Sequence, residues 1–207
     1  MKTHFVRFTV ILLVAIGFGS CDNEYELDKS IFIPDKDYPS LPAYTEWGYN
    51  TFGALYNREP FVNSDFSIPT KIICTGGKTS FSLKGHFGES RYYYYESDEK
   101  LITLNFDLLG FIPESLSNLI ELNDSIIDLT NPLCKVSLTL DTVEYDVTVL
   151  NGYLNFKRVQ YLFVDKQPYE IILSGIFDFQ ALINNEPSSI SMGRFDVGIP
   201  SDIFFKY

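Results

Sequence analysis

The chain has 207 residues and a formal net charge of -11 at pH 7, from 16 basic and 27 acidic side chains. This acidic balance argues against nucleic acid as a partner, because phosphate binding needs a basic patch. Hydrophobic residues make up 45% of the chain and aromatic residues 16%, which excludes a disordered chain and provides for one well-filled core.

The N-terminal residues follow the pattern of a bacterial lipoprotein signal. Lys2 and Arg7 form a positive region, residues 8–18 form a short apolar run, and small residues lead into Cys21. In such signals the peptide is cut before the cysteine, which then carries acyl chains. We therefore expect residues 1–20 to be a signal peptide and Cys21 to be the lipidated anchor in the membrane. The apolar run is shorter than the roughly 20 residues that a transmembrane helix needs.

Residues 21–49 are predicted to form a tether between the lipid and a folded domain. Acidic side chains crowd its start, and prolines then oppose any helix or strand ladder. The prolines are Pro34, Pro39 and Pro42. The acidic residues after the cysteine are similar to the surface-export signals of Bacteroidota lipoproteins. We expect a lipid-anchored outer-membrane protein that is exposed at the cell surface, with a periplasmic orientation as the alternative.

Residues 50–207 are predicted to form a single all-β domain. Apolar and polar residues alternate in runs such as 102–106, 136–140 and 173–181, and turn-forming residues separate the runs. This pattern predicts an antiparallel β-sandwich or flattened barrel of about nine to eleven strands. At most one short helix is expected, at residues 113–122, where leucine and isoleucine recur at helical spacing.

The dipeptide Asn151-Gly152 predicts a two-residue β-hairpin, because Asn-Gly tolerates the positive φ angles of a type I′ turn. The turn sets Leu150 opposite Tyr153. In this register four side chains share the buried face: Val147, Val149, Leu154 and Phe156.

Cys74 and Cys134 each lie in an apolar run that reads as a strand. A disulfide between them would close a loop of about 60 residues, which an oxidising envelope allows. Two buried free thiols on separate strands are the alternative, which we favour. Neither cysteine has the spacing of a zinc site.

Two parts of the domain carry a resemblance to a known family. They are residues 50–62 (NTFGALYNREPFV) near its start, and residues 173–179 (LSGIFDF) with 193–197 (GRFDV) near its end. They are similar to Bacteroidota lipoproteins of a family known mainly as a domain of unknown function. The resemblance implies an all-β lipoprotein and brings no activity or catalytic residue. This chain carries Arg58 where a glycine commonly follows the asparagine of the first hairpin, which argues against a type I′ turn there.

Few residues suggest catalysis. His86 is the only histidine after the signal, so a serine or cysteine nucleophile would depend on this single base, and a solvent-facing loop position accounts for it. Glycoside hydrolysis needs a carboxylate pair, for which the candidates are Asp107, Glu114, Asp178 and Asp196. We expect Asp196 to be an outward-facing carboxylate of a strand. No catalytic residue and no cofactor is predicted.

A calcium site is not predicted either. Asn123, Asp124 and Asp128 supply oxygen atoms, but they lack the spacing of a calcium-binding loop.

The run Tyr92-Tyr93-Tyr94-Tyr95 is the candidate binding platform. On a strand, Tyr92 and Tyr94 face one way while Tyr93 and Tyr95 face the other, so one pair can lie on the outer face. Exposed tyrosines form flat amphipathic surfaces for sugar rings or protein partners, although such a run also packs within a sheet. We predict a lipoprotein that acts by binding or assembly, with a glycan or an envelope protein as partner. A hydrolase of surface polysaccharide or peptide is the alternative.

Overall fold

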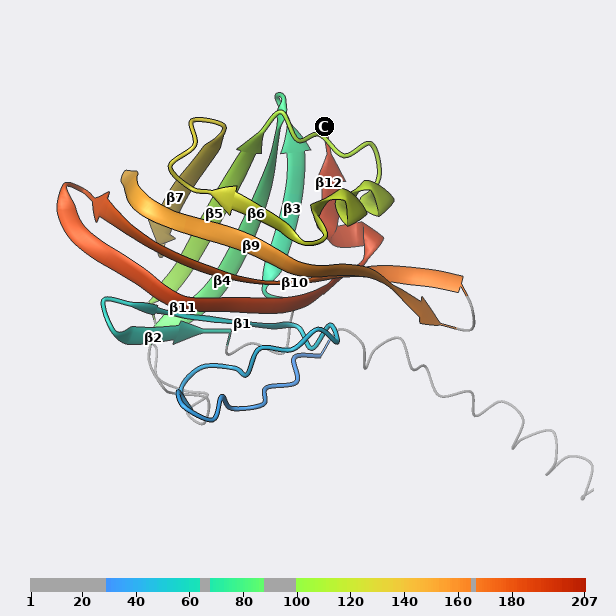
Figure 1. Cartoon of the computed structure of the whole chain (residues 1–207), viewed down its shortest axis with the longest axis horizontal. Coiled ribbons are helices and arrows are strands. Elements are labelled where there is room, and N and C mark those ends of the chain that lie inside the picture. The colour runs from blue at the N-terminus through green and yellow to red at the C-terminus, as the bar shows by residue number, and fades with distance from the viewer. Residues whose placement is uncertain (1–28, 64–67, 88–99, 165–166) are drawn as a thin grey trace, which may run out of the picture.

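The computed structural model describes residues 29–63, 68–87, 100–164 and 167–207 (Figure 1). Twelve strands and two 3₁₀ helices form within them. The elements are β1 (Thr51–Tyr56), β2 (Glu59–Val62), β3 (Thr70–Thr75), β4 (Lys78–Phe87), β5 (Leu101–Leu109), η1 (Leu116–Leu122), β6 (Ser125–Asp128), β7 (Cys134–Leu140), β8 (Val143–Tyr145), β9 (Val147–Val164), β10 (Gln167–Ile183), β11 (Glu186–Ile199), η2 (Ser201–Ile203) and β12 (Phe204–Lys206).

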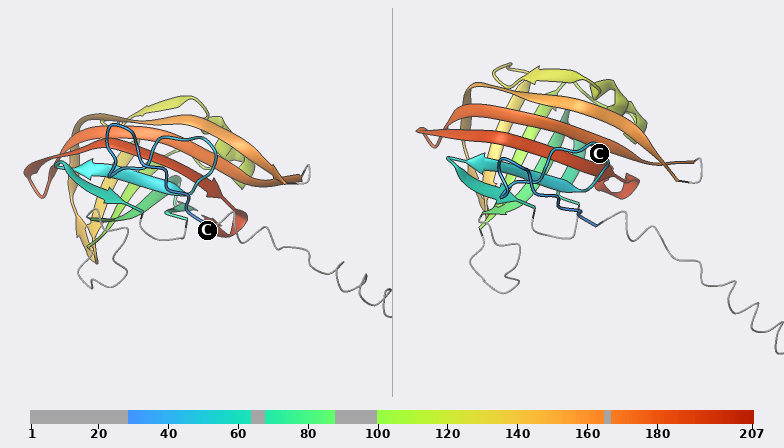
Figure 2. Two further views of the ribbon diagram at one scale, coloured as in Figure 1. Left: turned by 90° about the horizontal axis from the view of Figure 1, so that it is seen from below. Right: turned by 60° about the horizontal axis from the view of Figure 1, so that its bottom comes forward.

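The strands belong to one sheet that curls back over itself. Its order is β6-β9-β10-β11-β1-β2-β4-β5-β7-β8, and β3 pairs with β4 and, in parallel, with β12. The long strands β9 to β11 cross over β4, β5 and β7 (Figures 1 and 2). The predicted all-β fold is confirmed as a flattened, partly closed barrel. The strand count exceeds the expected range because β8 and β12, of three residues each, add to it.

Phenylalanine side chains fill the space inside the curled sheet. Phe106 of β5 contacts Phe177 and Phe179 of β10, with ring centroids 5.3 and 6.4 Å apart. Phe156 of β9 meets Phe81 of β4 at 5.4 Å. The cavity that remains among these strands measures about 10 Å³ and is mostly apolar, which leaves room for no more than a water molecule. The interior among these strands is therefore a packed core.

The alternating runs bury the faces that their two-residue period predicted. One set of side chains in each run is at most 2% exposed, while its neighbours point outward. These buried residues are Ile102, Leu104, Phe106, Val136, Leu138, Leu173, Phe177, Phe179 and Ala181.

The turn predicted at Asn151-Gly152 is wrong. Strand β9 continues through both residues, with Asn151 opposite Gln180 and Gly152 opposite Phe179 on β10. The backbone of β10 approaches so closely at this point that a glycine is needed within the strand.

A β-bulge gives the same side-chain pattern as the expected hairpin. Leu150 has no partner between the pairs Val149–Ala181 and Asn151–Gln180, so it is the extra residue of the bulge. The bulge shifts the inward–outward alternation of the side chains by one residue, so odd-numbered residues face the core before it and even-numbered residues after it. A two-residue turn would have the same effect. The predicted face is therefore correct: Leu154 and Phe156 are buried, and Val147 and Val149 pack against the core.

Replacing Gly152 with alanine should lower the free energy of unfolding by about 2 to 4 kcal/mol in denaturant titrations. Gly152 has a φ of +144°, and a Cβ there would lie 2.2 Å from the Phe179 Cβ and 2.5 Å from the Asp178 carbonyl oxygen. Rotating a side chain relieves neither contact. Gly76→Ala is the control, because Gly76 also has a positive φ but has open space where the methyl group would lie. Equal losses in the two variants would contradict the close approach.

Two-residue turns with positive φ angles connect neighbouring strands. Asn57 and Arg58, at φ 48° and 78°, join β1 to β2, and Asn184 and Asn185, at 51° and 66°, join β10 to β11. These angles are those of type I′ turns, which match the twist of the strands. The expectation that Arg58 opposes such a turn is therefore wrong, because the pairing of the flanking strands imposes the left-handed conformation on a residue other than glycine.

Among the described residues, the one helix longer than a single turn, η1, lies within the predicted range of residues 113–122. It is a 3₁₀ helix whose start is fixed by a hydrogen bond of 3.0 Å from the Ser115 amide to Asn118 Oδ1. Its side chains Leu119 and Leu122 are buried in the core, and η1 contacts β9 and β10. Within the described part of the chain, no helix has the length and apolar character needed to cross a membrane.

Cys74 on β3 and Cys134 on β7 are both buried and are not joined to each other. The prediction of two free thiols is confirmed. Burial, together with the charges of Asp107 and Asp128, raises the pKa of the Cys134 thiol to about 11. This thiol therefore stays protonated and unreactive at neutral pH.

Residues 29–49, here called the strap, lie against the outer face of the sheet (Figure 2, blue). Leu41 is fully buried, and Pro42 packs over β1 at Gly53, where a Cβ would lie 2.5 Å from the proline ring. A bridge between Pro34 and Pro42 folds the strap back on itself. For residues 29–49 this finding corrects the predicted tether of residues 21–49, because the prolines shape a compact turn that packs on the sheet. Residues 21–28 lie outside the described residues.

Candidate functional site

The second half of strand β11, residues 193–199, is buried on both faces. Phe195 and Val197 point into the core, while Arg194 and Asp196 point outward and are covered by the strap. Arg194 is 8% exposed and Asp196 1% exposed. Charged groups are buried at such positions only when they are paired or hydrogen-bonded, so the strap must supply their partners.

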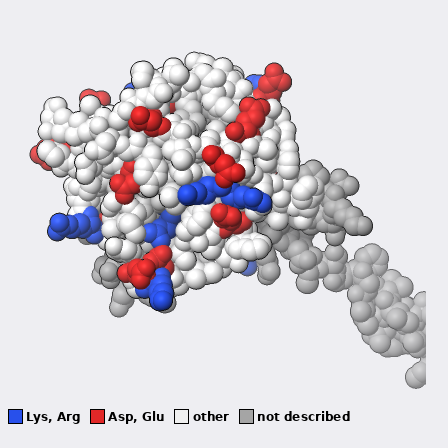
Figure 3. Space-filling model, in the orientation of Figure 1, with Lys and Arg blue, Asp and Glu red and all other residues white. Residues whose placement is uncertain are grey.

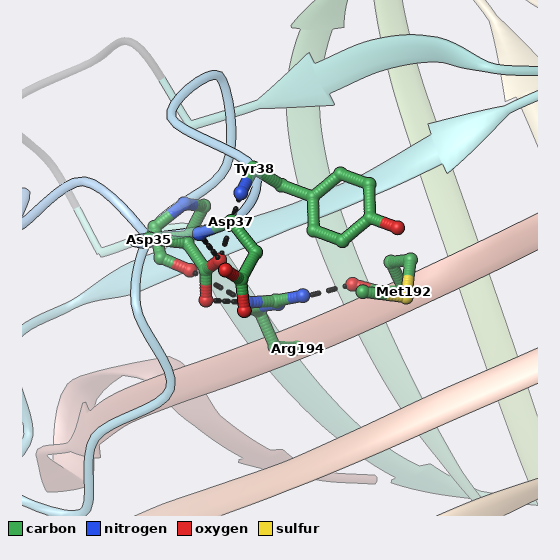
Figure 4. Close-up of polar contacts among 6 residues, drawn as sticks. Asp35, Asp37, Tyr38, Met192 and Arg194 are labelled. Carbon is green, nitrogen blue, oxygen red and sulfur yellow. Dashed lines mark hydrogen bonds and ion pairs between the residues drawn. The ribbon is translucent and has the colours of Figure 1, made fainter.

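Arg194 fastens the first half of the strap (Figure 4). Its Nη1 lies 2.6 Å from Asp35 Oδ2, and its Nε donates to the Met192 carbonyl at 3.1 Å. Asp35 Oδ1 also accepts the amides of Asp37 and Tyr38, each at 2.9 Å. Partial burial opposes ionisation of Asp35, but these amides and the Arg194 guanidinium outweigh it and hold the pKa of the carboxyl below its ordinary value of 3.8.

The Asp35–Arg194 pair should weaken in acid. Because the pKa of Asp35 is lower in the folded protein than in the unfolded chain, its stabilisation is present above pH 3.8 and is lost as the pH falls through the folded value. At neutral pH we expect Asp35→Asn to cost about 1 to 3 kcal/mol. The difference in unfolding free energy between wild type and variant should shrink below about pH 4. A difference that stays constant down to pH 2 would contradict this assignment, and Asp202→Asn serves as an exposed control.

Asp196 fastens the second half of the strap. Its carboxylate accepts hydrogen bonds of 2.5 to 3.2 Å from the hydroxyl groups of Thr45 and Ser174 and from the amides of Trp47, Gly48 and Tyr49. Three successive amides thus converge on one anion, which fixes the loop. Gly48 lies with φ +73° directly over Ile172 of β10, so the loop crosses β11 and β10 in close contact.

A shallow pocket of about 420 Å³ lies where this fixed loop meets the outer face of β9. It is lined by Tyr44, Thr45, Glu46, Trp47, Arg158 and Gln160. Trp47 is the only tryptophan of the chain, and it is 70% exposed. The volume falls within the range of about 300 to 1,000 Å³ typical of small-ligand sites. We call it the Trp47 pocket.

Hydrogen bonds hold the polar groups of the Trp47 pocket in place. Gln160 Nε2 donates to the Glu46 carbonyl at 2.8 Å, and Arg158 Nε donates to Gln160 Oε1 at 3.2 Å. The Tyr44 hydroxyl donates to Glu46 Oε1 at 2.9 Å. Burial, with the hydrogen bond and charge of Glu46, raises the pKa of Tyr44 above its ordinary value of 10.0, so Tyr44 remains a donor. The pocket therefore presents an aromatic face beside ordered donors and acceptors.

The carboxylates named as hydrolase candidates do not form a pair. Asp196 lies opposite Ser174, four positions from Asp178 along β10, which is about 13 Å at the usual strand rise. Glycosidase carboxylates lie about 5 to 9.5 Å apart. Asp196 does face outward as expected, but it is saturated with strap donors.

The other two candidate acids lie elsewhere. Asp107 on β5 is bound to Lys78 and to the Ser80 hydroxyl of β4. Glu114 is exposed in the connection between β5 and η1. The structure therefore assembles no acid–base pair from the four candidates.

His86 does not lie in a loop, which corrects the prediction. It belongs to β4, opposite Val62 of β2 and Leu101 of β5, and it is partly buried. Pairing on both edges of the strand explains why Gly85 is part of the strand and not of a turn.

The residues considered for calcium serve local contacts. Asn123 Oδ1 accepts the Val159 amide at 2.8 Å, and Asp128 accepts the amide and hydroxyl of Thr130. Within the described residues, no cluster of histidine, cysteine or acidic side chains has the arrangement of a metal site.

The tyrosine platform and the lipid anchor lie outside the described residues, at Tyr92 to Tyr95 and at Cys21. On the face shown in Figure 3, basic and acidic side chains of the described residues are interspersed, and the basic ones form no continuous patch.

The Trp47 pocket is a site that the sequence alone did not indicate. Trp47 lies in the segment assigned to the tether, and Arg158 and Gln160 are polar residues on the outer face of a strand, where solvated side chains are usual. A sole tryptophan next to Gly48 was the one available signal, since a large aromatic residue is unusual in a solvated linker.

The motifs at residues 50–62, 173–179 and 193–197 lie side by side, because β1 pairs with β11 and β11 with β10. Residues on their outer face contact the strap. Gly53 lies under Pro42, and Arg194 binds Asp35. Asp196 accepts hydrogen bonds from Ser174 and from the loop that carries Trp47. No family model, curated protein or solved structure matches the chain.

Proposed function

We propose that this protein is an outer-membrane lipoprotein, anchored through Cys21 and displayed at the cell surface, that captures carbohydrate in the Trp47 pocket. The sequence pattern before Cys21 and the acidic residues after it support the anchor and the surface position. The fixed aromatic and polar groups of the pocket support the ligand class.

The observation that carries the proposal is the exposed Trp47 on a loop that cannot move freely. Trp47 is 70% exposed, so the flat face of its indole ring is available for contact with a ligand. The Asp196 carboxylate orders the loop before any ligand arrives. Such preorganisation reduces the entropy lost on binding.

Sugar rings match this combination of groups. The C–H face of a pyranose is weakly positive and stacks on the negative face of an indole ring. Its hydroxyl groups both donate and accept hydrogen bonds. They can therefore pair with the Glu46 carboxylate, which accepts, with the Arg158 guanidinium, which donates, and with the Gln160 amide, which does both. Hydrolysis is disfavoured here, because Glu46 is the one carboxylate among the described residues that line the pocket.

A lipid at Cys21 would also keep the domain close to the membrane. The described strap begins at residue 29, so residues 22–28 connect it to the lipidated cysteine. Such a connection spans at most roughly 25 Å. Glycans that the pocket captures would thus be held near the outer leaflet.

The experiment is a binding screen on an oligosaccharide panel of neutral and anionic sugars, with the lipoprotein in a detergent that has no sugar head group. We expect Trp47→Ala to abolish binding without lowering the melting temperature, because the side chain is mostly solvated. Tyr207→Ala is the matched control, since Tyr207 is 82% exposed and remote in sequence from the pocket. Absence of binding across the panel, or unchanged binding by Trp47→Ala, would overturn the proposal.

A further inference from the structure

The last residues of β9 and the first of β10 project beyond the rest of the sheet (Figures 1 and 2). Here Tyr161 pairs with Ile171 and Val164 with Gln167. Strand β6 pairs with residues 153–156 of β9 on the edge that faces away from β10. Among the described residues, no strand pairs with that edge after residue 156. We call residues 160–164 of β9 the arm.

Tyr161 and Phe163 direct their backbone groups to the unpaired edge of the arm. In an antiparallel sheet the N–H and C=O groups of successive residues point to alternate edges. The Val159 amide donates at 2.8 Å to Oδ1 of Asn123, which lies just before β6 and so on the edge away from β10. The next odd-numbered residues, Tyr161 and Phe163, therefore face this edge too. The shift in pairing at Pro168 adds a residue to β10 and none to β9, so the alternation along β9 continues.

The unpaired edge has the length of the arm itself. It begins after Val159, whose amide is occupied by Asn123, and it ends with β9 at Val164. Leu162 is therefore the middle residue of the arm. A second arm in antiparallel orientation covers this edge from end to end, because it has the same length and the same middle residue.

The side chains that lie along the open edge are aromatic. Tyr161 is 41% exposed and Phe163 is 59% exposed, and their ring centroids lie 5.9 Å apart. Exposed hydrophobic side chains on an unpaired edge strand favour pairing with a strand of another chain. The arm therefore combines free backbone groups with an apolar surface for such a strand.

We propose that two copies of this chain pair through their arms, antiparallel and with a two-fold axis at Leu162. Tyr161 of each copy then lies opposite Phe163 of the other, and the backbone groups of each such pair exchange two hydrogen bonds. The same register sets ring against ring on one face of the joined sheet. Every donor and every ring finds its counterpart in an identical arm, so the fitting partner is a second copy. This inference rests neither on carbohydrate binding nor on the anchor.

The interface between the arms is small. An aromatic side chain covers about 150 to 250 Å², so the exposed parts of the two rings amount to roughly 200 Å² in each copy. Two copies together bury about 400 Å² of aromatic surface, which is less than the roughly 1,200 Å² of a stable complex. The dimer is therefore in equilibrium with the monomer, and a disulfide across the axis can trap it.

The test is disulfide trapping of Leu162→Cys in the purified full chain at about 0.1 mM. Residues of a non-hydrogen-bonded antiparallel pair have Cα atoms about 4.5 Å apart, which a disulfide can span. Mild oxidation should therefore give a covalent dimer on a non-reducing gel, above the background that wild type shows from Cys21.

Arg158→Cys is the matched control for the trapping. Its position is exposed on the same strand, but in the proposed register it lies about 26 Å from its copy, so it should give no dimer above wild type. No more dimer from Leu162→Cys than from Arg158→Cys would overturn the proposal.

Two further variants of the Leu162→Cys chain test the backbone pairing. Phe163→Pro and Phe163→Ala both remove the ring, but only proline also removes the N–H that faces the partner. This N–H points away from β10, so both variants should melt alike. The proline variant loses two hydrogen bonds per dimer and should give about tenfold less trapped dimer than the alanine variant. Equal trapping by the two would show that the arms do not pair as strands, and would overturn the proposal.

Discussion

Replacing Asp196 with asparagine is expected to lower the free energy of unfolding by about 3 to 5 kcal/mol and to release the strap from the sheet. The carboxylate is 1% exposed and accepts five hydrogen bonds, three of them from the amides of Trp47, Gly48 and Tyr49. An asparagine side chain offers one oxygen and turns two donors toward groups that also donate. Several buried amides would thus lose their acceptor.

Denaturant titration measures the loss, and hydrogen exchange at Trp47 to Tyr49 reports the release of the strap. Asp178→Asn is the matched control on the neighbouring strand. Asp178 accepts one long hydrogen bond of 3.3 Å, from the Met192 amide, so its variant should lose no more than about 1 kcal/mol. Equal losses, or unchanged exchange in Asp196→Asn, would show that the strap is held by other contacts.

The second large effect concerns the anchor. We expect Cys21→Ala to move the protein from the membrane fraction to the soluble fraction, because no acyl chain can then be attached. Each buried methylene contributes about 0.8 kcal/mol, so two or more chains hold a protein stably and their loss leaves no equivalent attachment. Membrane fractionation after a high-salt wash is the measurement.

Cys134→Ala is the control for this experiment, because Cys134 is buried in β7 and is not available for acylation. It should remain with the membranes. A Cys21→Ala protein that still pellets after the salt wash would contradict the lipoprotein assignment.

Side-chain alternation was enough to predict which faces of the strands form the core. Runs such as Ile102, Leu104 and Phe106 have a period of two because one face of each strand packs inward. The same local information could not separate a hairpin from a β-bulge at Leu150, because both shift the alternation by one residue. Only the long-range pairing of β9 with β10 distinguishes the two.

The site was harder to predict because its parts are distant in sequence. Asp196 and Trp47 are 149 residues apart, and the aspartate acquires its role only when the strap covers β11. By composition Pro34 and Pro42 indicate an extended tether, whereas in the structure they pair across a turn that Arg194 fastens. Composition alone does not show that a proline-containing segment has a surface to pack on.

The most direct test of carbohydrate capture uses the intrinsic fluorescence of Trp47, which reports on the pocket alone because the chain has no other tryptophan. A panel oligosaccharide that binds should shift the emission to shorter wavelength and protect the indole from acrylamide quenching. In Asp196→Asn, whose loop is no longer fixed, the same sugar should bind about tenfold more weakly. Binding seen by calorimetry without any change in Trp47 emission would contradict the assignment of the pocket.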